Sequence, residues 1–353
     1  MARYPGGAQG SGRNRTRNRI FMILGLLCAV AVIALIYGPG PFGRSESEEG
    51  ILAGPPIDIN GPEVNEVTPS EPVPGPVVET ERAEPNLTKP VLAEAVVQPN
   101  PEAQTMISEA IELLAAKPSR ILEAREKLNK ALLVPMSSQQ RMFVKERLSE
   151  IADEWLFSRK IFPDDRLCGT YKVETGDQLS VIGKTYKVPH ELIMKINRIS
   201  NPRLLRLGDT IKVVNGPFHA KIYRSTFTMD IYLQDTFVRS YSVGLGKEGM
   251  ETPTGLWAVK PDGKLVEPPW PDPETGILLH AGDPGYALGS RWIALEGLEG
   301  EAKDRSGFGI HGTKDPQTIG TPSSRGCIRL HNGDAIFVYD LLVPVHSLVR
   351  VED

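Results

Sequence analysis

The proline content of residues 51–100 limits which parts of this chain can form a packed core. Ten of these fifty residues are proline, mixed with glutamate, valine and glycine. A segment of this composition buries too little apolar surface to offset the entropy that it would lose on ordering. We therefore predict a disordered linker over residues 38–100, and we expect the folded domains within residues 101–353.

A basic segment and an apolar segment precede the linker. Residues 1–19 contain five arginines and no acidic residue, and residues 20–37 carry no charge. A helix of that apolar length spans about 27 Å, close to the hydrocarbon core of a bilayer. Because basic flanks stay in the cytoplasm, the sequence predicts a cytoplasmic tail, one transmembrane helix in the inner (cytoplasmic) membrane, and an extracytoplasmic, or periplasmic, remainder. A cleaved signal peptide is the alternative, although no A-x-A cleavage site follows the apolar run.

The charges and cysteines argue against several classes of protein. The formal net charge of −4, with 24% charged residues, is too balanced to predict a nucleic-acid partner. Cys28 lies in the apolar run, so only Cys168 and Cys327 can face water, and we expect no disulfide framework. No metal site is predicted, because four histidines are scattered without the spacing of zinc ligands. They are His280, His311, His331 and His346.

Residues 101–165 show apolar residues at helical spacing in three stretches. Pro118 separates the first predicted helix from the second, with Ser119 as the predicted N-cap of the second. Ser137 and Gln140 form a capping-box pattern at the start of the third. The helix pair is similar to a tetratricopeptide-like hairpin. Two interpretations stay open, a surface that binds a protein partner and a small helical bundle that packs on its neighbours.

Residues 169–215 have the pattern of a strand, two short helices and a second strand. Turn signals at Gly176-Asp177 and at Gly208-Asp209 bound the apolar stretches. The opening V-x-x-G-D-x-L, the central N-x-I and the final L-x-x-G-x-x-I-x-V resemble a LysM domain, which has a βααβ fold. The resemblance implies binding of glycans that contain N-acetylglucosamine.

By the same resemblance, the glycan-binding groove lies after the first strand and after the second helix. Seven residues are expected to line it: Gly176, Asp177, Gln178, Leu179, Asn197, Arg198 and Ile199. Asp177 has an alternative role as the cap of the first helix of the unit.

A cysteine and a histidine lie close together in a glycine-rich stretch near the C-terminus. The segment Ile310-His311-Gly312-Thr313 is followed by Ser323-Ser324-Arg325-Gly326-Cys327-Ile328-Arg329. An imidazole can withdraw the proton of a thiol, which is mostly protonated at neutral pH, and so create the nucleophilic thiolate. Gly326 allows a tight turn, and such a turn can aim backbone N–H groups at a developing oxyanion. A lone cysteine near a histidine is more often structural, so the residue types alone do not establish catalysis.

The pattern HGT…IG…SxGCIR resembles the signature of the L,D-transpeptidase catalytic domain of the YkuD-like family. The matching residues are His311, Gly312, Thr313, Ile319, Gly320, Ser324, Gly326, Cys327, Ile328 and Arg329. The family often has a histidine between the serine and the glycine, where this chain has Arg325. The resemblance covers residues 217–353 and implies a mostly β domain, a sandwich-like pair of sheets with the active site in a cleft.

This family resemblance also implies roles for the residues of the motif. Cys327 is the predicted nucleophile and His311 the predicted general base. In the family a backbone carbonyl next to the histidine commonly orients the imidazole, and here that neighbour is Gly312. The backbone amides of Arg325, Gly326 and Cys327 are the predicted oxyanion donors.

Four further residues are predicted on the substrate side of the site. Ser324 either supports the loop or contacts the substrate. Arg329 either recognises a carboxylate of an anionic peptide or forms a buried salt bridge that holds the loop. His280 and His331 lie near the motif and are predicted to line the cleft.

These parts together predict a multidomain protein: a transmembrane helix, a disordered linker, a small α-helical region, a βααβ LysM domain and a mostly-β L,D-transpeptidase domain. The resemblance implies a peptidoglycan L,D-transpeptidase that forms 3→3 crosslinks through a thioester on Cys327, without a cofactor. Its predicted partners are peptidoglycan strands and stems, the membrane, and a protein in one interpretation of the helical region. The alternatives are an L,D-carboxypeptidase or endopeptidase, an enzyme that anchors proteins to peptidoglycan, and a non-catalytic wall-binding scaffold.

Overall fold

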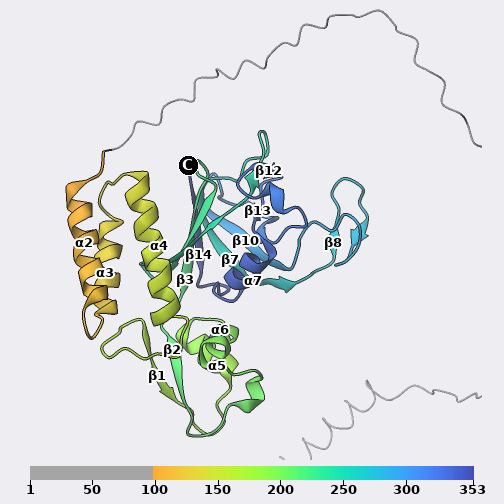
Figure 1. Cartoon of the computed structure of the whole chain (residues 1–353). Coiled ribbons are helices and arrows are strands. Elements are labelled where there is room, and N and C mark those ends of the chain that lie inside the picture. The colour runs from red at the N-terminus through yellow and green to blue at the C-terminus, as the bar shows by residue number, and fades with distance from the viewer. Residues whose placement is uncertain (1–97) are drawn as a thin grey trace, which may run out of the picture. The chain divides into compact units, whose positions relative to one another are not determined.

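The structure is a computed structural model that describes residues 98–353, which belong to one compact unit (Figure 1). The tail predicted over residues 1–19, the helix predicted over 20–37 and most of the predicted linker lie outside the described residues. Within the described part, no helix is both long enough and apolar enough to span a bilayer.

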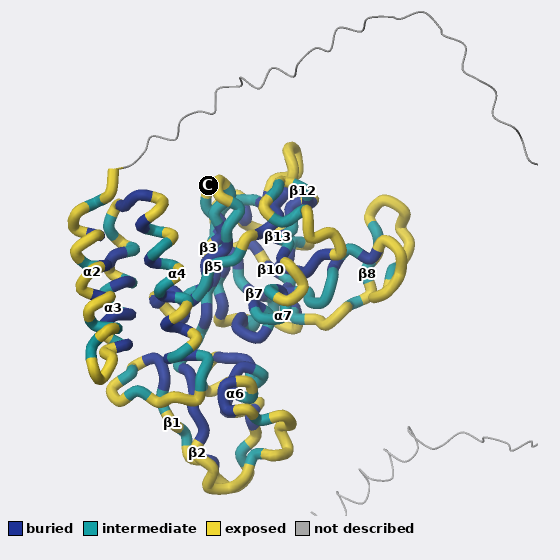
Figure 2. Tube along the Cα trace, viewed as in Figure 1, coloured by how far each residue is buried: buried dark blue, intermediate teal, exposed yellow. Residues whose placement is uncertain are grey.

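Three helices open the described chain, as the apolar spacing predicts. They are α2 (Pro101–Ala115), α3 (Ile121–Ala131) and α4 (Ser138–Trp155). Buried and exposed residues alternate along each of them in Figure 2, which is the pattern of helices that bury one face. Leu128 of α3 and Leu148 of α4 are almost fully buried in the resulting core.

One of the two predicted helix caps is present. The Ser137 side chain accepts a hydrogen bond from the Gln140 backbone, and the Gln140 side chain accepts one from the Ser137 backbone, which together form the predicted capping box. The predicted cap Ser119 is wrong. The residue before α3 is Arg120, which makes no cap hydrogen bond and forms an ion pair with Glu123 in the first turn.

The helical region packs on the C-terminal sheet through α4 and strand β5 (Thr236–Ser242). Lys145 of α4 forms an ion pair of 2.6 Å with Asp230, whose side chain is fully buried. The side-chain oxygen of Asn129 accepts a hydrogen bond of 2.8 Å from the backbone N–H of Phe237. These contacts agree with the interpretation of a small bundle that packs on its neighbours, and the partner-binding interpretation stays a prediction.

The second part of the fold is the predicted βααβ unit. Strand β1 (Cys168–Lys172) pairs antiparallel with β2 (Thr210–Val214). Helices α5 (Leu179–Tyr186) and α6 (His190–Asn197) connect the two strands. A short 3-10 helix, η1 (Pro202–Leu204), lies between α6 and β2.

Lys212 of β2 joins this unit to the helical region. Its buried side chain donates hydrogen bonds to the carbonyls of Ser158 at 3.0 Å and Lys160 at 2.8 Å, and also to that of Trp155 at the end of α4. Carbonyls at and after a helix C-terminus lack helical donors, and the ammonium group has three donors to offer. Burial lowers the pKa of Lys212, but each of its three donors has an acceptor.

Cys168, the other cysteine outside the apolar run of residues 20–37, lies at the same junction. Cys168 is buried, and this burial raises the pKa of its thiol to about 12. The carboxyl of Asp165, which forms a buried ion pair of 3.0 Å with Arg125, also raises that pKa. Cys168 therefore stays a protonated thiol and is not a candidate nucleophile.

The C-terminal part is built on one eight-stranded mixed sheet. Its strands in spatial order are β13 (Ile328–Arg329), β11 (Phe308–His311), β10 (Arg291–Gly300), β7 (Gly255–Val266), β14 (Leu348–Glu352), β3 (Phe218–Tyr223), β4 (Thr228–Leu233) and β5. The pairs β14–β3 and β11–β13 are parallel, and the other pairs are antiparallel.

The mostly-β prediction is confirmed, but the sandwich-like pair of sheets is corrected. Strand β14 bonds to β7 on one side and to β3 on the other, so the last strand of the chain joins two antiparallel meanders into one sheet. The pair β12 (Pro322–Ser324) and β6 (Leu245–Gly246) forms only a separate two-stranded piece.

Two further segments frame the end of the sheet near β13. Helix α7 (Asn332–Tyr339) follows β13 and packs on β10 and β11. Residues 267–289, which we call the arm, leave the sheet after β7. They contain the small hairpin of β8 (Trp270–Pro271) and β9 (Leu278–Leu279). Figure 2 shows the outer part of this arm as mostly exposed.

The substitution Lys212→Met should destabilise the folded protein, because three carbonyls lose their common donor. We expect the free energy of unfolding to fall by about 2 kcal/mol, as is usual when buried polar groups lose a partner. Urea unfolding followed by circular dichroism measures this change. Lys172→Met, at an exposed position of β1, is the control and should change the value by less than about 0.5 kcal/mol. An equal loss in both variants would contradict the role given to Lys212.

Candidate active site

The parallel pairing of β11 with β13 brings the predicted nucleophile and base together. In this register Ile310 lies opposite Ile328, and His311 lies opposite Arg329. Cys327 directly precedes β13, so continuing the register places it opposite the residue two positions before His311. Because side chains two positions apart along a strand share one face, Cys327 and His311 project to the same side of the sheet.

The imidazole of His311 is buried and held by its own backbone neighbour. Its Nδ1 lies 2.6 Å from the carbonyl oxygen of Gly312. A carbonyl oxygen only accepts hydrogen bonds, so Nδ1 carries the proton and Nε2 keeps its lone pair. This is the hydrogen bond that the predicted orienting role of Gly312 requires. The indole of Trp292 stacks on the imidazole of His311, with ring centroids 5.6 Å apart.

Burial makes His311 a neutral base in the resting protein. Desolvation lowers the pKa of its imidazole to about 4, and the nearby cation of Arg329 acts in the same direction. The backbone carbonyls of Gly312 and Leu288 oppose this shift, because they bond to the protonated ring. At neutral pH the ring is therefore uncharged and able to accept a proton.

The thiol of Cys327 is also neutral at rest. Burial raises its pKa, whereas a hydrogen bond from the Gly309 backbone and the cation of Arg329 lower it. The Cys327 Sγ lies 4.0 Å from the carbonyl oxygen of Gly307. The thiol and imidazole therefore do not form a resting ion pair, and the thiol proton must leave during the attack itself.

The turn before Cys327 is held together by Ser324. The buried Ser324 Oγ donates to the Cys327 carbonyl at 2.6 Å and accepts from the Gly326 backbone N–H at 3.1 Å. Gly326 has a φ of +108°, and a Cβ there would lie 2.6 Å from the Phe308 ring. Thr252 Oγ1 also donates to the Gly326 carbonyl at 2.9 Å. Of the two interpretations of Ser324, the structure shows loop support. The Gly326 N–H bonds within the turn, and its role as an oxyanion donor stays a prediction.

Arg325 connects this turn to the arm. Its partly exposed guanidinium forms an ion pair with Glu274, which lies between β8 and β9. Thus the residue that stands where the family often has histidine contacts a segment of the chain outside the motif. The role of its backbone amide as an oxyanion donor stays a prediction.

Arg329 lies opposite His311 in the β11–β13 register, and its charge acts to lower the pKa of both Cys327 and His311. Its Nε is buried and has no hydrogen-bond partner among the described residues. Nor does any carboxylate within residues 98–353 form a salt bridge with Arg329. The salt-bridge interpretation is therefore not what the structure shows.

His280 and His331, which were predicted to line the cleft, lie on two different segments. His280 is exposed on the arm, where its imidazole lies 3.8 Å from Asp283. His331 is exposed at the start of α7, near Asp334, whose pKa is raised by burial in spite of the opposing effect of His331. Neither forms a hydrogen bond with the motif residues, and a place in the cleft stays a prediction. In the described part of the chain, no three histidine, cysteine, aspartate or glutamate side chains are grouped as a metal site would require.

A small cavity of 380 Å³ opens between the two loops of the βααβ unit. It is lined by Asp177, Gln178, Leu179, Ser180, His190, Pro202, Arg203 and Leu205. Asp177, Gln178 and Leu179 were predicted to line the groove. The lining residues around η1 were missed, because the sequence motif does not extend to them. Gly176, Arg198 and Ile199 lie outside this lining.

Two of the predicted glycan-binding residues make hydrogen bonds within the βααβ unit. Asn197 is buried, where its amide donates to the Lys212 carbonyl and its oxygen accepts from the Lys212 N–H, both at 2.8 Å. Asp177 accepts from the Tyr171 hydroxyl at 2.8 Å and from the Glu174 N–H at 2.7 Å. It therefore closes the turn after β1, while α5 has no side-chain cap.

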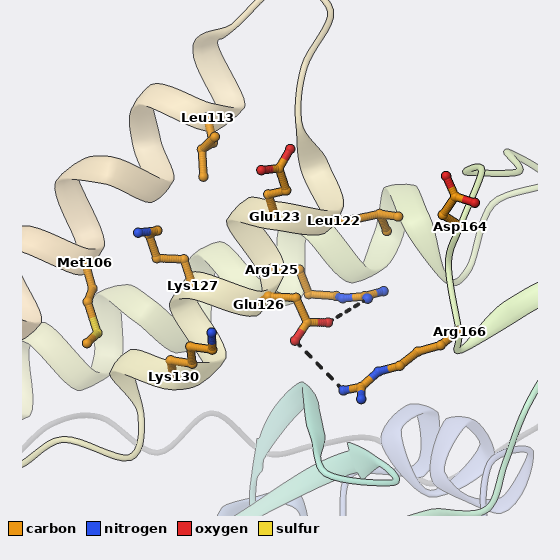
Figure 3. Close-up of a pocket in the computed structure, with 10 residues that line it drawn as sticks. All are labelled: Met106, Leu113, Leu122, Glu123, Arg125, Glu126, Lys127, Lys130, Asp164 and Arg166. Carbon is orange, nitrogen blue, oxygen red and sulfur yellow. Dashed lines mark hydrogen bonds and ion pairs between the residues drawn. The ribbon is translucent and has the colours of Figure 1, made fainter.

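A larger cavity of 560 Å³ lies on the helical region (Figure 3). Its lining comes from α2, α3 and the segment before β1: Met106, Leu113, Leu122, Glu123, Arg125, Glu126, Lys127, Lys130, Asp164 and Arg166. Glu126 lies between two guanidinium groups, 2.9 Å from that of Arg125 and 3.9 Å from that of Arg166. The mixed charges favour no single ligand chemistry, so a protein partner at this surface stays a prediction.

Comparison with known proteins matches two parts of the chain. The family model of the L,D-transpeptidase catalytic domain matches residues 217–351, and that of the LysM domain matches residues 171–214. In Bacillus subtilis (strain 168), two proteins named as L,D-transpeptidases are similar. YkuD is 28% identical over 177 residues, which cover 47% of this chain and 89% of YkuD. YqjB is 30% identical over 146 residues, which cover 41% of this chain and 73% of YqjB.

Solved structures are also similar to part of this chain. An L,D-transpeptidase from Mycobacterium smegmatis is 17% identical, with a TM-score of 0.30. The match covers 41% of this chain and 64% of that one, so this chain spans less than two thirds of the solved structure.

Alkylation of Cys327 by iodoacetamide should accelerate steadily between about pH 6 and about pH 9. The reactive species is the thiolate, whose fraction grows about tenfold per pH unit below the thiol pKa. Mass spectrometry of the Cys327 peptide measures the rate, and the buried Cys168 peptide is the internal control. A rate independent of pH over this range would show a thiolate–imidazolium pair and contradict the neutral resting state.

Proposed function

This chain belongs to the L,D-transpeptidase family, and from that premise we propose that Cys327 forms a thioester with a peptidoglycan stem and passes it to a second stem as a 3→3 crosslink. The observation that carries the proposal is the β11–β13 register, which sets Cys327 and His311 on one face of the sheet. The hydrogen bond from His311 Nδ1 to Gly312 leaves Nε2 as the base.

The first proposed step forms the acyl-enzyme. Sγ of Cys327 attacks the carbonyl of the amide that precedes the terminal D-alanine, while Nε2 of His311 accepts the thiol proton. The carbonyls of Gly312 and Leu288 favour the imidazolium that results. His311 then donates its proton to the departing amine, so D-alanine leaves and a thioester remains on Cys327.

The second proposed step resolves the thioester. A side-chain amine of another stem attacks the thioester carbonyl, and His311 accepts a proton from this amine. The new amide forms, the C–S bond breaks, and the Cys327 thiolate recovers its proton from His311. Water in place of the amine would give a carboxypeptidase or endopeptidase, and a protein lysine would give an anchoring enzyme.

Arg329 is proposed to bind a carboxylate of the anionic stem. Its Nε is buried without a partner in residues 98–353, and a guanidinium pairs with a carboxylate through two parallel hydrogen bonds. A bound carboxylate would also reduce the effect of the Arg329 cation on the imidazolium, and so support the first proton transfer.

The LysM domain is proposed to hold a glycan strand that contains N-acetylglucosamine. The cavity beside α5 and η1 supplies Gln178 and Arg203 as hydrogen-bond donors and Leu205 as an apolar contact. We also propose that the segment over residues 20–37 anchors the protein in the cytoplasmic membrane, with its catalytic part outside. The charge pattern of residues 1–37 supports this orientation.

Mass spectrometry of products tests the catalytic proposal. The protein is incubated with purified disaccharide-tetrapeptide, with Cys327→Ala as the control. We expect a dimer that is lighter than two substrates by one D-alanine, and none from Cys327→Ala. Tripeptide with free D-alanine but no dimer would identify a hydrolase. No product at all, with glycan binding retained, would indicate a scaffold or a protein acceptor.

Sedimentation with insoluble peptidoglycan tests the LysM proposal. Arg203→Glu should weaken binding about tenfold, the equivalent of ~1.4 kcal/mol, because Arg203 lines the cavity. Arg206→Glu makes the same charge change at an exposed position outside the cavity and is the matched control. Equal weakening in both variants would mean that only overall charge matters, which would contradict the assigned groove.

A further inference from the structure

One asparagine outside the recognised motif connects two chain segments beside the catalytic histidine. Asn332 is the first residue of α7. Its Nδ2 donates to the Thr313 carbonyl at 3.0 Å, and its Oδ1 accepts from the Ser290 backbone N–H at 3.0 Å. The Ser290 hydroxyl in turn donates to the Asn332 backbone carbonyl at 3.0 Å. One carboxamide thus uses both its donor and its acceptor to tie the end of the arm to the strand that carries His311.

The chain makes room for this carboxamide with two glycines. A Cβ at Gly312 would lie 2.1 Å from Asn332 Oδ1, and a Cβ at Gly289 would lie 2.2 Å from it. Gly289 also has a φ of +63°, which favours glycine. Since such distances are far below van der Waals contact, both positions accept only glycine while Asn332 stays in place.

Both segments that Asn332 joins act on His311 through backbone carbonyls. The Gly312 carbonyl accepts the hydrogen bond of His311 Nδ1 at 2.6 Å. The Leu288 carbonyl, one residue before Gly289, also favours the protonated ring. A change in the place of the carboxamide would therefore move the Gly312 carbonyl, which determines the tautomer and orientation of the imidazole.

We propose that Asn332 is a positioning residue, which keeps His311 in its Nδ1–H form with Nε2 aimed at the thiol. It does so by fixing Gly312-Thr313 and Gly289-Ser290 against each other. The proposal rests on the proposed function for its effect on the reaction. Its effect on the histidine tautomer exists without any substrate.

The chemistry of the site requires an amide and not a carboxylate. Aspartate at this position has the same shape, so it still accepts from the Ser290 N–H. It has no donor for the Thr313 carbonyl, however. Its second carboxylate oxygen would face that carbonyl oxygen, and the two oxygens would repel each other. Asn332→Asp therefore removes one defined hydrogen bond while it retains the side-chain volume, and Asn332→Ala removes both.

The test measures the ring nitrogens of His311 in the full-length protein in detergent micelles. The protein is labelled with ¹⁵N-histidine, and the His311 signals are assigned by their loss in His311→Gln. The wild type should show a protonated Nδ1 and an unprotonated Nε2. In Asn332→Ala and Asn332→Asp, the two nitrogens should shift towards each other as the second tautomer becomes populated. Asn215→Ala, which loses a hydrogen bond of 2.8 Å to the Arg166 carbonyl, is the matched control and should keep the wild-type signals.

Turnover with the disaccharide-tetrapeptide supplies the second measurement. We expect kcat to fall about 100-fold in both Asn332 variants, the effect of a misplacement of roughly 1 Å. KM should stay within about twofold, because Asn332 binds no part of the substrate. Wild-type nitrogen signals in both variants would overturn the proposal, as would a kcat that falls only as far as the folded fraction does. If the variants shift the nitrogen signals but the wild-type protein shows no turnover, the role of Asn332 is supported and the proposed function is rejected.

Discussion

The candidate site depends on one short parallel pairing at the edge of the sheet. Strand β13 contains only Ile328 and Arg329, yet its register with β11 places Cys327 and His311 on one face. The bonds that hold this short strand come largely from outside it. Gly244 and Arg329 exchange two backbone hydrogen bonds of 2.8 and 2.9 Å, and the Leu330 N–H donates to the His311 carbonyl at 2.9 Å.

Burial is the second constraint, and it favours the uncharged form of both reactive groups. It lowers the pKa of His311 and raises that of Cys327, so neither carries a charge at rest. The cation of Arg329 has opposite effects on reactivity at the two residues, because it stabilises a thiolate and destabilises an imidazolium. A substrate carboxylate that neutralises Arg329 would therefore link binding to proton transfer, which is a reason for an arginine beside both groups.

The sequence was sufficient for features that are encoded locally. The capping box of Ser137 and Gln140, the βααβ unit, and the hydrogen bond between His311 and Gly312 all follow from short motifs. Features that depend on strand register were not accessible. Nothing local shows that Trp292 lies opposite His311, that Asn332 reaches Ser290, or that Arg325 meets Glu274 of the arm. The hydrogen bonds of Asn197 were not accessible either, since they depend on the packing of α6 against Lys212 of β2.

The neutral state of Cys327 has a consequence for how long the residue survives. Oxidants attack the thiolate much faster than the thiol, and oxidation beyond the sulfenic acid is not readily reversed. A half-buried thiol whose pKa is raised by burial presents little thiolate between turnovers. The burial that keeps Cys327 protonated therefore also slows oxidation of its sulfur.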